Sequence, residues 1–339
     1  MSAVTDIALP GLLLLILAYA EIHYKILRLP SRYFKREPEI IADMPHRIEP
    51  WQPLPVLLLV KDAHRYPIHL NRVEIFLWEG ERWKELLLKS YDEQRIDARF
   101  WHRLFEIQLL PGGMPKKIRV VIRYTCRGKS RVCEADNYAQ TSHEPFEVFC
   151  DPHPLPAERG WVFGDLHSHS HYSDDQVEFG APLSVIPRLA QRMGLHFFAV
   201  TDHSYDLDDM PDNYLKNDPK LGKWNRFQKE VSRLNREQPL TIIPGEEVSA
   251  GNHKNQNVHF LILNNREFFP GNGDSGEAWP HTRPAMSIPH ILDNLDDNAV
   301  GIAAHPAIKA PFLEWLLIRR GHWRAQDYSA PGLSGVQMW

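Results

Sequence analysis

The chain alternates apolar and polar positions in two different rhythms, one before about residue 150 and one after it. Between residues 55 and 150 the apolar runs are short, and turn sequences such as Glu79-Gly80 and Pro111-Gly112-Gly113 separate them. Short runs at this spacing are typical of β-strands in a small sandwich. We therefore predict a β-sandwich-like domain at residues 55–150. Its expected strands lie at residues 55–60, 72–78, 83–88, 105–109 and 117–124.

After the proline-rich segment 150–156 the rhythm changes, which marks a domain boundary. Apolar strand-like runs now alternate with helical segments. That alternation is typical of an α/β fold, in which helices cover parallel strands, as in a barrel. The expected strands lie at residues 161–167, 196–200, 240–244, 258–263, 300–304 and 335–339, and the expected helices at 182–193, 224–237, 288–296 and 312–320.

Two further segments precede the sandwich. Residues 1–30 contain an apolar stretch, 7–20, which is shorter than the roughly 20 residues that span a bilayer. It also lacks the basic start and the cleavage site of a signal peptide. We expect a docked helix in a cytoplasmic protein, with peripheral membrane contact as the alternative. Residues 31–54 are rich in proline, arginine and glutamate and predict an extended connector.

The composition excludes some classes of site and partner. The chain has 39 basic and 43 acidic residues, a net charge of -4, which gives no electrostatic basis for nucleic-acid binding. Its three cysteines are too few for a disulfide framework and show no zinc-binding spacing. Any metal must therefore be held by carboxylates and by some of the 18 histidines. Oligomeric state is not encoded in any pattern that we recognise.

The densest group of polar residues lies at residues 164–174, directly after an apolar run. His167 and His169 are two apart, so on a strand they project from the same face. Two imidazoles on one face can chelate a divalent metal, and Asp174 could add an oxygen ligand. This segment alone predicts a metal-dependent hydrolase.

The other predicted strands of the second half also carry potential metal ligands. The carboxyl ends of parallel strands meet at one edge of a sheet, where active sites of such folds gather. Taken singly, each residue has an ordinary explanation as a turn, a helix cap or a loop start. Together they predict one metal site. The residues are Asp202 and His203, Glu246 and Glu247, His259, and His305.

The order of these motifs resembles the polymerase and histidinol phosphatase (PHP) superfamily of metal-dependent hydrolases. The matching pieces are Asp165-Leu166-His167-Ser168-His169 with Ser173-Asp174, Thr201-Asp202-His203, Pro244-Gly245-Glu246-Glu247, Val258-His259 and Ala304-His305-Pro306. The preceding sandwich resembles the CehA/McbA-like branch of that superfamily. The resemblance implies a distorted (β/α)7 barrel at residues 157–339 with two or three divalent ions (Mn, Zn or Fe).

The resemblance also implies a ligand set. His167, His169 and Glu247 would bind the first metal. Glu247 would bridge to a second metal held by His259 and His305, and Asp174 and His203 would bind a third. Asp202, with Asp165, would orient ligands as an outer partner, because ligating histidines usually donate their other N–H to an acceptor.

The implied activity is hydrolysis of a small-molecule phosphoester by metal-activated water. His171, Glu246 and His253 lie beside the motifs and are candidates for proton transfer. Arg283 and Lys309 are candidates for phosphate binding; Arg319 and Arg320 could do the same or simply complement a helix dipole. The glycine-rich loop 271–276 is expected to be flexible and could cover the site. The alternatives are a carbamate or ester hydrolase and a non-catalytic remnant.

The chain departs from the family at its end. PHP proteins carry an Asp-x-His pair on a last strand, whereas residues 335–339 resemble the strand before it and no such pair follows. The resemblance therefore implies a truncated barrel. The first and third metal sites would each lack a ligand, while the second, with Glu247, His259 and His305, would be complete. On this basis we expect weak metal retention and low activity.

Overall fold

The computed structural model describes residues 36–138, 141–156, 158–174, 179–211, 213–271, 273–275 and 278–338. The helix expected at residues 1–30 lies outside them. The chain divides into two compact units. The sandwich unit comprises Tyr33–Gly164 and Ser184–Phe197, and the half-barrel unit comprises Asp165–Leu183 and Phe198–Trp339. Within the described ranges, no helix combines the length and apolar character needed to cross a membrane.

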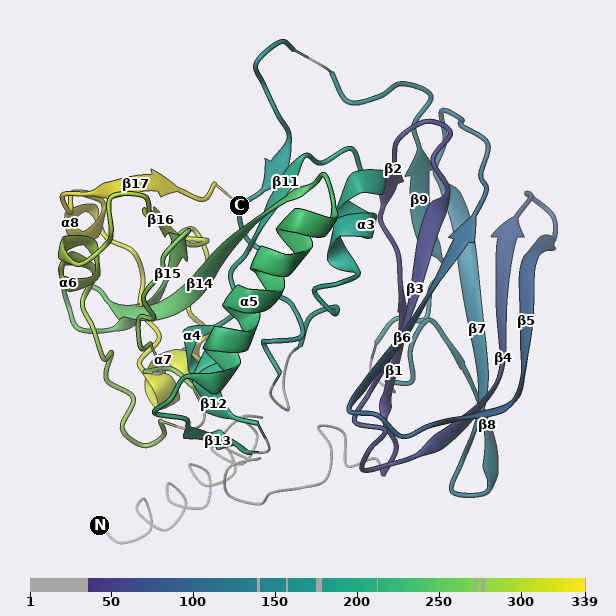
Figure 1. The fold of residues 1–339 in the computed structure, drawn as a ribbon, viewed down its shortest axis with the longest axis horizontal. Coiled ribbons are helices and arrows are strands. Elements are labelled where there is room, and N and C mark those ends of the chain that lie inside the picture. Colours follow the sequence, from purple (N-terminus) through teal and green to yellow (C-terminus); the bar gives the residue numbers. More distant parts are fainter. Residues whose placement is uncertain are drawn as a thin grey trace, which may run out of the picture. The chain divides into compact units, whose positions relative to one another are not determined.

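The sandwich unit contains two β-sheets (Figure 1). The first has the order β1-β3-β6, and both pairs are antiparallel. The second has the order β2-β9-β7-β4-β5, with β8 paired to β7. The strands are β1 (Glu39–Asp43), β2 (Arg47–Ile48), β3 (Leu54–Lys61), β4 (Ile68–Trp78), β5 (Trp83–Ile96), β6 (Phe100–Ile107), β7 (Lys116–Cys126), β8 (Lys129–Glu134) and β9 (Phe146–Cys150).

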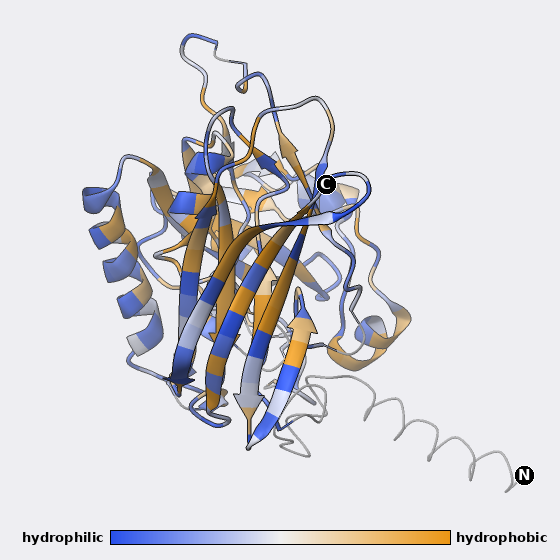
Figure 2. Ribbon diagram, turned by 90° about the vertical axis from the view of Figure 1, so that its right-hand side faces the viewer, coloured by the Kyte–Doolittle hydropathy of each residue, from blue (hydrophilic) through white to orange (hydrophobic). Residues whose placement is uncertain are grey.

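The two sheets precede the half-barrel sheet in the chain and share one hydrophobic core. Along β7, Ile118, Val120 and Ile122 are buried, and Arg119 and Arg123 between and beyond them are more exposed. Figure 2 shows hydrophobic and hydrophilic residues alternating on the strands that face the viewer. The unit extends beyond the predicted limits. Strands β1 and β2 lie in the segment that we expected to be a connector, because Ile40 and Ile48 are buried in the same core. Helix α3 (Ile186–Arg192) also belongs to this unit.

The half-barrel unit is built on a curled mixed sheet with the order β10-β11-β14-β15-β16-β17 (Figure 1). Its strands are β10 (Gly164–Asp165), β11 (Phe197–Val200), β14 (Thr241–Gly251), β15 (Asn257–Leu263), β16 (Val300–Ala303) and β17 (Leu333–Val336). Strand β17 runs parallel to β16, but β14–β15 and β15–β16 are antiparallel. The expectation of purely parallel strands is therefore wrong. Only residues 252–256 join β14 to β15, too few for the crossover that parallel strands require.

Helices cover the sheet and explain its apolar strands. Helix α5 (Gly222–Glu237) packs on β14 and buries Trp224, Phe227, Val231 and Leu234, which recur every three or four residues. Helix α6 (Ile288–Asp293) packs on one face of β15, against Phe260 and Ile262, and this strand is buried along its whole length. The remaining elements are α4 (Ser204–Leu207), β12 (Asp209–Met210), β13 (Asn213–Asn217), α7 (Phe312–Ile318) and α8 (Ala325–Tyr328).

Candidate metal centre

A buried glutamate, Glu247, lies at the centre of the predicted site, with its side chain 1% exposed. It is in the middle of β14, and not after a strand end as we expected, because β14 continues to Gly251. The pairing of β14 with β15 places Ser249 opposite His259, so Glu247 and His259 share one face of the sheet. Five histidines surround the carboxylate: His167 and His169 after β10, His203 before α4, His259 on β15, and His305 after β16.

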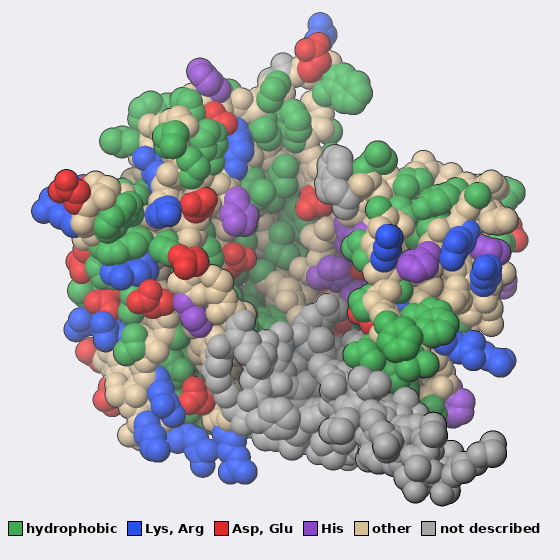
Figure 3. All heavy atoms as spheres, turned by 180° about the vertical axis from the view of Figure 1, so that it is seen from behind, with side chains coloured by type: hydrophobic (Ala, Val, Ile, Leu, Met, Phe, Trp, Pro, Cys, Tyr) green, Lys and Arg blue, Asp and Glu red, His purple; other side chains and the backbone are tan. Residues whose placement is uncertain are grey.

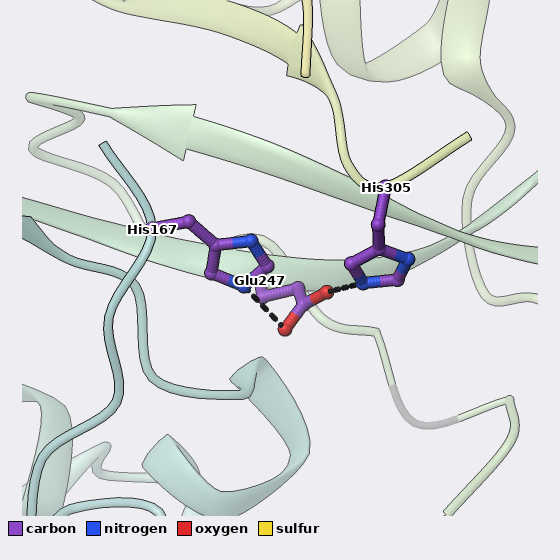
Figure 4. Close-up of side chains that lie close together, drawn as sticks. All are labelled: His167, Glu247 and His305. Atoms are coloured by element: carbon purple, nitrogen blue, oxygen red, sulfur yellow. Dashed lines mark hydrogen bonds and ion pairs between the residues drawn. The ribbon is translucent and has the colours of Figure 1, made fainter. Parts of the chain in front are cut away.

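The two carboxylate oxygens of Glu247 face different histidines. Oε2 lies 3.2 Å from His167 Nε2, 3.1 Å from His169 Nε2 and 3.4 Å from His203 Nδ1. Oε1 lies 2.9 Å from His305 Nε2 and 2.5 Å from His259 Nδ1. Figure 4 shows this division for His167 and His305. We refer to Glu247 with His167, His169 and His203 as the Oε2 side, and to Glu247 with His259 and His305 as the Oε1 side.

The Oε2 side has the spacing of metal ligands. Ligand atoms bound at about 2.0–2.1 Å to one ion lie about 2.9–3.4 Å apart in tetrahedral or octahedral geometry. The Oε2 distances fall in this range, as does the 3.2 Å between the Nε2 atoms of His167 and His169. Two groups of three bring their ligand atoms within 4.8 Å of one another, His167 with Glu247 and His305, and His169 with His203 and Glu247. The prediction that histidines and a glutamate form a potential metal site is confirmed.

The charge state of these groups suits metal binding. Burial raises the pKa of Glu247, but the charges of His259 and His203 and the hydrogen bonds from His167 and His169 outweigh it and hold that pKa well below its usual value. Burial lowers the pKa of His305, which favours the neutral imidazole. The ionised form of Glu247 and the neutral form of His305 are the forms that bind a divalent cation.

Two polar side chains that the sequence did not single out orient the histidines. Gln337, just beyond β17, has its Oε1 3.1 Å from His167 Nδ1 and accepts the backbone N–H of His305 at 2.8 Å. It thereby supports His305, which has a left-handed φ of 24°. The hydroxyl of Ser173 lies 3.2 Å from His169 Nδ1 and accepts the N–H of His203.

Asp202 and Asp165, the two acids predicted to orient the metal ligands, accept hydrogen bonds from backbone N–H groups. Asp202 is buried and accepts the N–H groups of Ser170 and Ser173, so it fixes the turn after His169. Asp165 is exposed and accepts the N–H of His167.

Asp174 is buried in the same turn, but neither metal-binding group found among the described residues includes it. His203 is grouped with His169 and Glu247, whereas the family resemblance paired it with Asp174.

The three candidates for proton transfer lie outside both metal-binding groups. Glu246 points to the opposite face of β14 from Glu247, where it accepts from Asn265, and burial raises its pKa well above the usual value. His253 lies in the turn after β14 and pairs with Asp327. His171 accepts the N–H of Leu183, and burial lowers its pKa.

A pocket of about 240 Å³ adjoins His259 and His305. Lys309, Arg320 and His322 are among its lining residues, together with the acid Glu314. Arg283, the other phosphate-binding candidate, is exposed and does not belong to this lining.

Arg320 reaches the Oε1 side, where it forms an ion pair with Asp274 and contacts both ring nitrogens of His259. Asp274 was not predicted, because it lies in the loop that we expected to be a flexible cover. The described residues of that loop are instead packed against the sheet: a Cβ at Gly271 would lie 2.6 Å from Val248 Cγ1 on β14. Burial raises the pKa of Asp274, but the charge of Arg320 and a hydrogen bond from His259 hold it below the usual value.

Comparison with known proteins adds no assignment. No protein-family model matches the chain, and no curated protein matches it either. The resemblance to PHP hydrolases therefore rests on the motifs alone. Independently of that resemblance, the structure shows a group of histidines around the buried Glu247 that could hold a metal ion.

Proposed function

We propose that this protein is a metal-dependent hydrolase of phosphoesters. The proposal rests on the ligand-like spacing of the Oε2 side and on a pocket beside His259 and His305, on the Oε1 side, that is lined by cationic side chains. When bound, a divalent cation supplies Lewis-acid chemistry, polarising a phosphoryl oxygen and lowering the pKa of water toward neutrality.

The pocket supports an anionic substrate. Arg320 is held in place by Asp274 and keeps one edge on the pocket, since its side chain is 18% exposed. Burial lowers the pKa of Arg320, but the charges of Asp274 and Glu247 raise it above the usual value, so it stays positive. Lys309 adds a second positive charge. Two such cations can bind non-bridging phosphoryl oxygens and stabilise the charge that develops on them. Figure 3 shows histidine, lysine and arginine side chains on the surface of the half-barrel unit, on the right of the view.

The proposal includes a fold assignment. The curled half-barrel sheet is compatible with part of a distorted PHP-type barrel, and the motif order in the chain supports that membership. The natural metal would be Mn, Zn or Fe, because histidine and carboxylate ligands accept all three.

The proposal is tested by assaying purified protein, loaded with Mn²⁺ or Zn²⁺, on chromogenic phosphomonoesters, phosphodiesters and aryl carbamates. We expect phosphoester turnover that falls at least about 100-fold in His167→Ala, since a metal ligand is lost. Lys309→Met is expected to raise KM about tenfold. Arg283→Met is the matched control and should match the wild-type protein.

Two outcomes would contradict the phosphoester assignment. Turnover of carbamates without turnover of phosphoesters would favour the carbamate or ester hydrolase. Absence of turnover on every substrate, in a folded protein that binds metal, would favour a non-catalytic remnant.

A further inference from the structure

A largely buried arginine, Arg320, lies where the motif resemblance would put a second metal ion. Arg320 follows α7 and is fixed by its backbone neighbours: Asn257 donates its N–H to Arg319 O at 3.0 Å and accepts the N–H of Gly321 at 2.7 Å. Asn257 lies two residues before His259 on β15. The guanidinium is thereby brought onto the same face as His259, where Asp274 pairs with it.

The hydrogen bonds leave His259 without a lone pair for a metal. An arginine side chain can only donate hydrogen bonds, and Arg320 contacts both ring nitrogens of His259. In the neutral ring it therefore takes the lone pair of whichever nitrogen is unprotonated, while the protonated nitrogen faces a carboxylate, Glu247 from Nδ1 or Asp274 from Nε2. If the ring is protonated, neither nitrogen has a lone pair. His259 therefore cannot ligate while Arg320 is in place.

The distance from Glu247 to His259 agrees with this hydrogen bonding, whereas the 2.9 Å from Glu247 Oε1 to His305 Nε2 lies in the range of metal ligands. The 2.5 Å between His259 Nδ1 and Glu247 Oε1 is shorter than the roughly 2.9–3.4 Å expected between two ligands of one ion. The Oε2 side, built on the same carboxylate, has 3.1–3.4 Å throughout.

From these contacts we infer that Arg320 takes the place of a second metal ion, so that His259 is not a metal ligand in this protein. Metal binding is confined to Glu247 with His167, His169, His203 and His305. The guanidinium, with its charge fixed by Asp274, supplies the positive charge on the Oε1 side. This inference rests on metal binding by the chain and not on which bond the protein hydrolyses.

The experiment counts bound metal in the full chain. Metal-free protein is titrated with Zn²⁺ against a chromophoric chelator, and the stoichiometry is checked by elemental analysis. His259→Gln is expected to keep the wild-type stoichiometry, with affinity within about threefold. The double variant Arg320→Met/Asp274→Asn removes both charges together and exposes the His259 lone pair. It is expected to bind one equivalent more than the wild-type protein, and adding His259→Gln should remove that equivalent.

A second measurement does not depend on any variant folding. In ¹⁵N-histidine-labelled wild-type protein, Zn²⁺ should shift the ring nitrogens of His167 and His169 and leave those of His259 nearly unchanged. Any of three results would overturn the inference. These are the loss of a metal equivalent in His259→Gln, a zinc-induced coordination shift at His259, and no gain of metal in the folded double variant.

Discussion

The two sides of Glu247 use one carboxylate for two different purposes. On the Oε2 side the neighbours are imidazoles at ligand spacing, and their other nitrogens face Gln337 or Ser173. On the Oε1 side His259 is enclosed by Asp274 and Arg320. The difference teaches that a metal-binding motif in a sequence does not fix how many ions are bound. A neighbouring charged pair can convert a ligand into a hydrogen-bonding residue.

The largest effect is expected from Glu247→Gln, because it alters both sides at once. Structural zinc sites are bound with about 10–16 kcal/mol shared among four ligands, so one ligand contributes about 3–4 kcal/mol, or 10²–10³-fold in affinity. We expect Zn²⁺ affinity to fall by that factor in a chelator-competition titration. Glu246→Gln is the matched control, because its side chain points to the opposite face of β14. An equal loss in both variants would contradict the central role of Glu247.

The next largest effect is expected on the stability of the metal-free protein when the Oε1 side alone is changed. Asp274→Asn leaves the guanidinium of Arg320 without its close buried partner, and we expect the free energy of unfolding to fall by about 3 kcal/mol at pH 7. Urea denaturation measures this loss of unfolding free energy. The exposed pair Lys84–Glu79 is the control, and Glu79→Gln should cost at most about 1 kcal/mol.

The same variant predicts a pH dependence. The pKa of Asp274 is lowered in the folded protein, so its contribution to stability is present above its unfolded value of about 4 and is lost as the pH falls below that. The difference between wild type and Asp274→Asn should therefore be largest near neutral pH and shrink in more acidic solution. A difference that grows toward acid would show that the carboxylate is not the stabilising form.

The smallest effect is expected from Gln337→Leu, which removes an acceptor near His167 and His305 but no ligand. Outer partners of metal ligands typically contribute 10–100-fold in affinity, and we expect a loss in that range. Gln337→Glu keeps an acceptor oxygen and should retain most of the binding. If Gln337→Leu instead unfolds the protein in circular dichroism, the side chain serves the fold more than the site.

The sequence predicts the participating histidines better than their surroundings. His167, His169, His203 and His305 lie near strand ends, where a local pattern suffices to find them. The residue pattern alone could not decide between Glu246 and Glu247, because strand alternation assigns faces only once the pairing of β14 with β15 is known. The choice of Glu247 came from the resemblance to PHP proteins. Asp274 and Gln337 reach the site from a loop and from the far edge of the sheet, through contacts that no local pattern encodes.

For the fold too, local sequence patterns locate the elements but not how distant elements pair. Apolar periodicity located helix α5 and most strands, since burial on one face leaves a local signal. The direction of β15 depends on a five-residue connection, which the alternation of elements does not reveal. The apolar composition of β15 is equally compatible with a parallel or an antiparallel neighbour, because both of its faces are buried.

The contact between Gln337 and His167 has a mechanical consequence. Strands β10 and β17 are the two open edges of the half-barrel sheet, and these two residues lie just beyond them in sequence. Among the described residues, this side-chain contact therefore links the two edges of the sheet. Loosening one edge should loosen the other, so the two margins of the sheet, 170 residues apart in sequence, are expected to open as one unit.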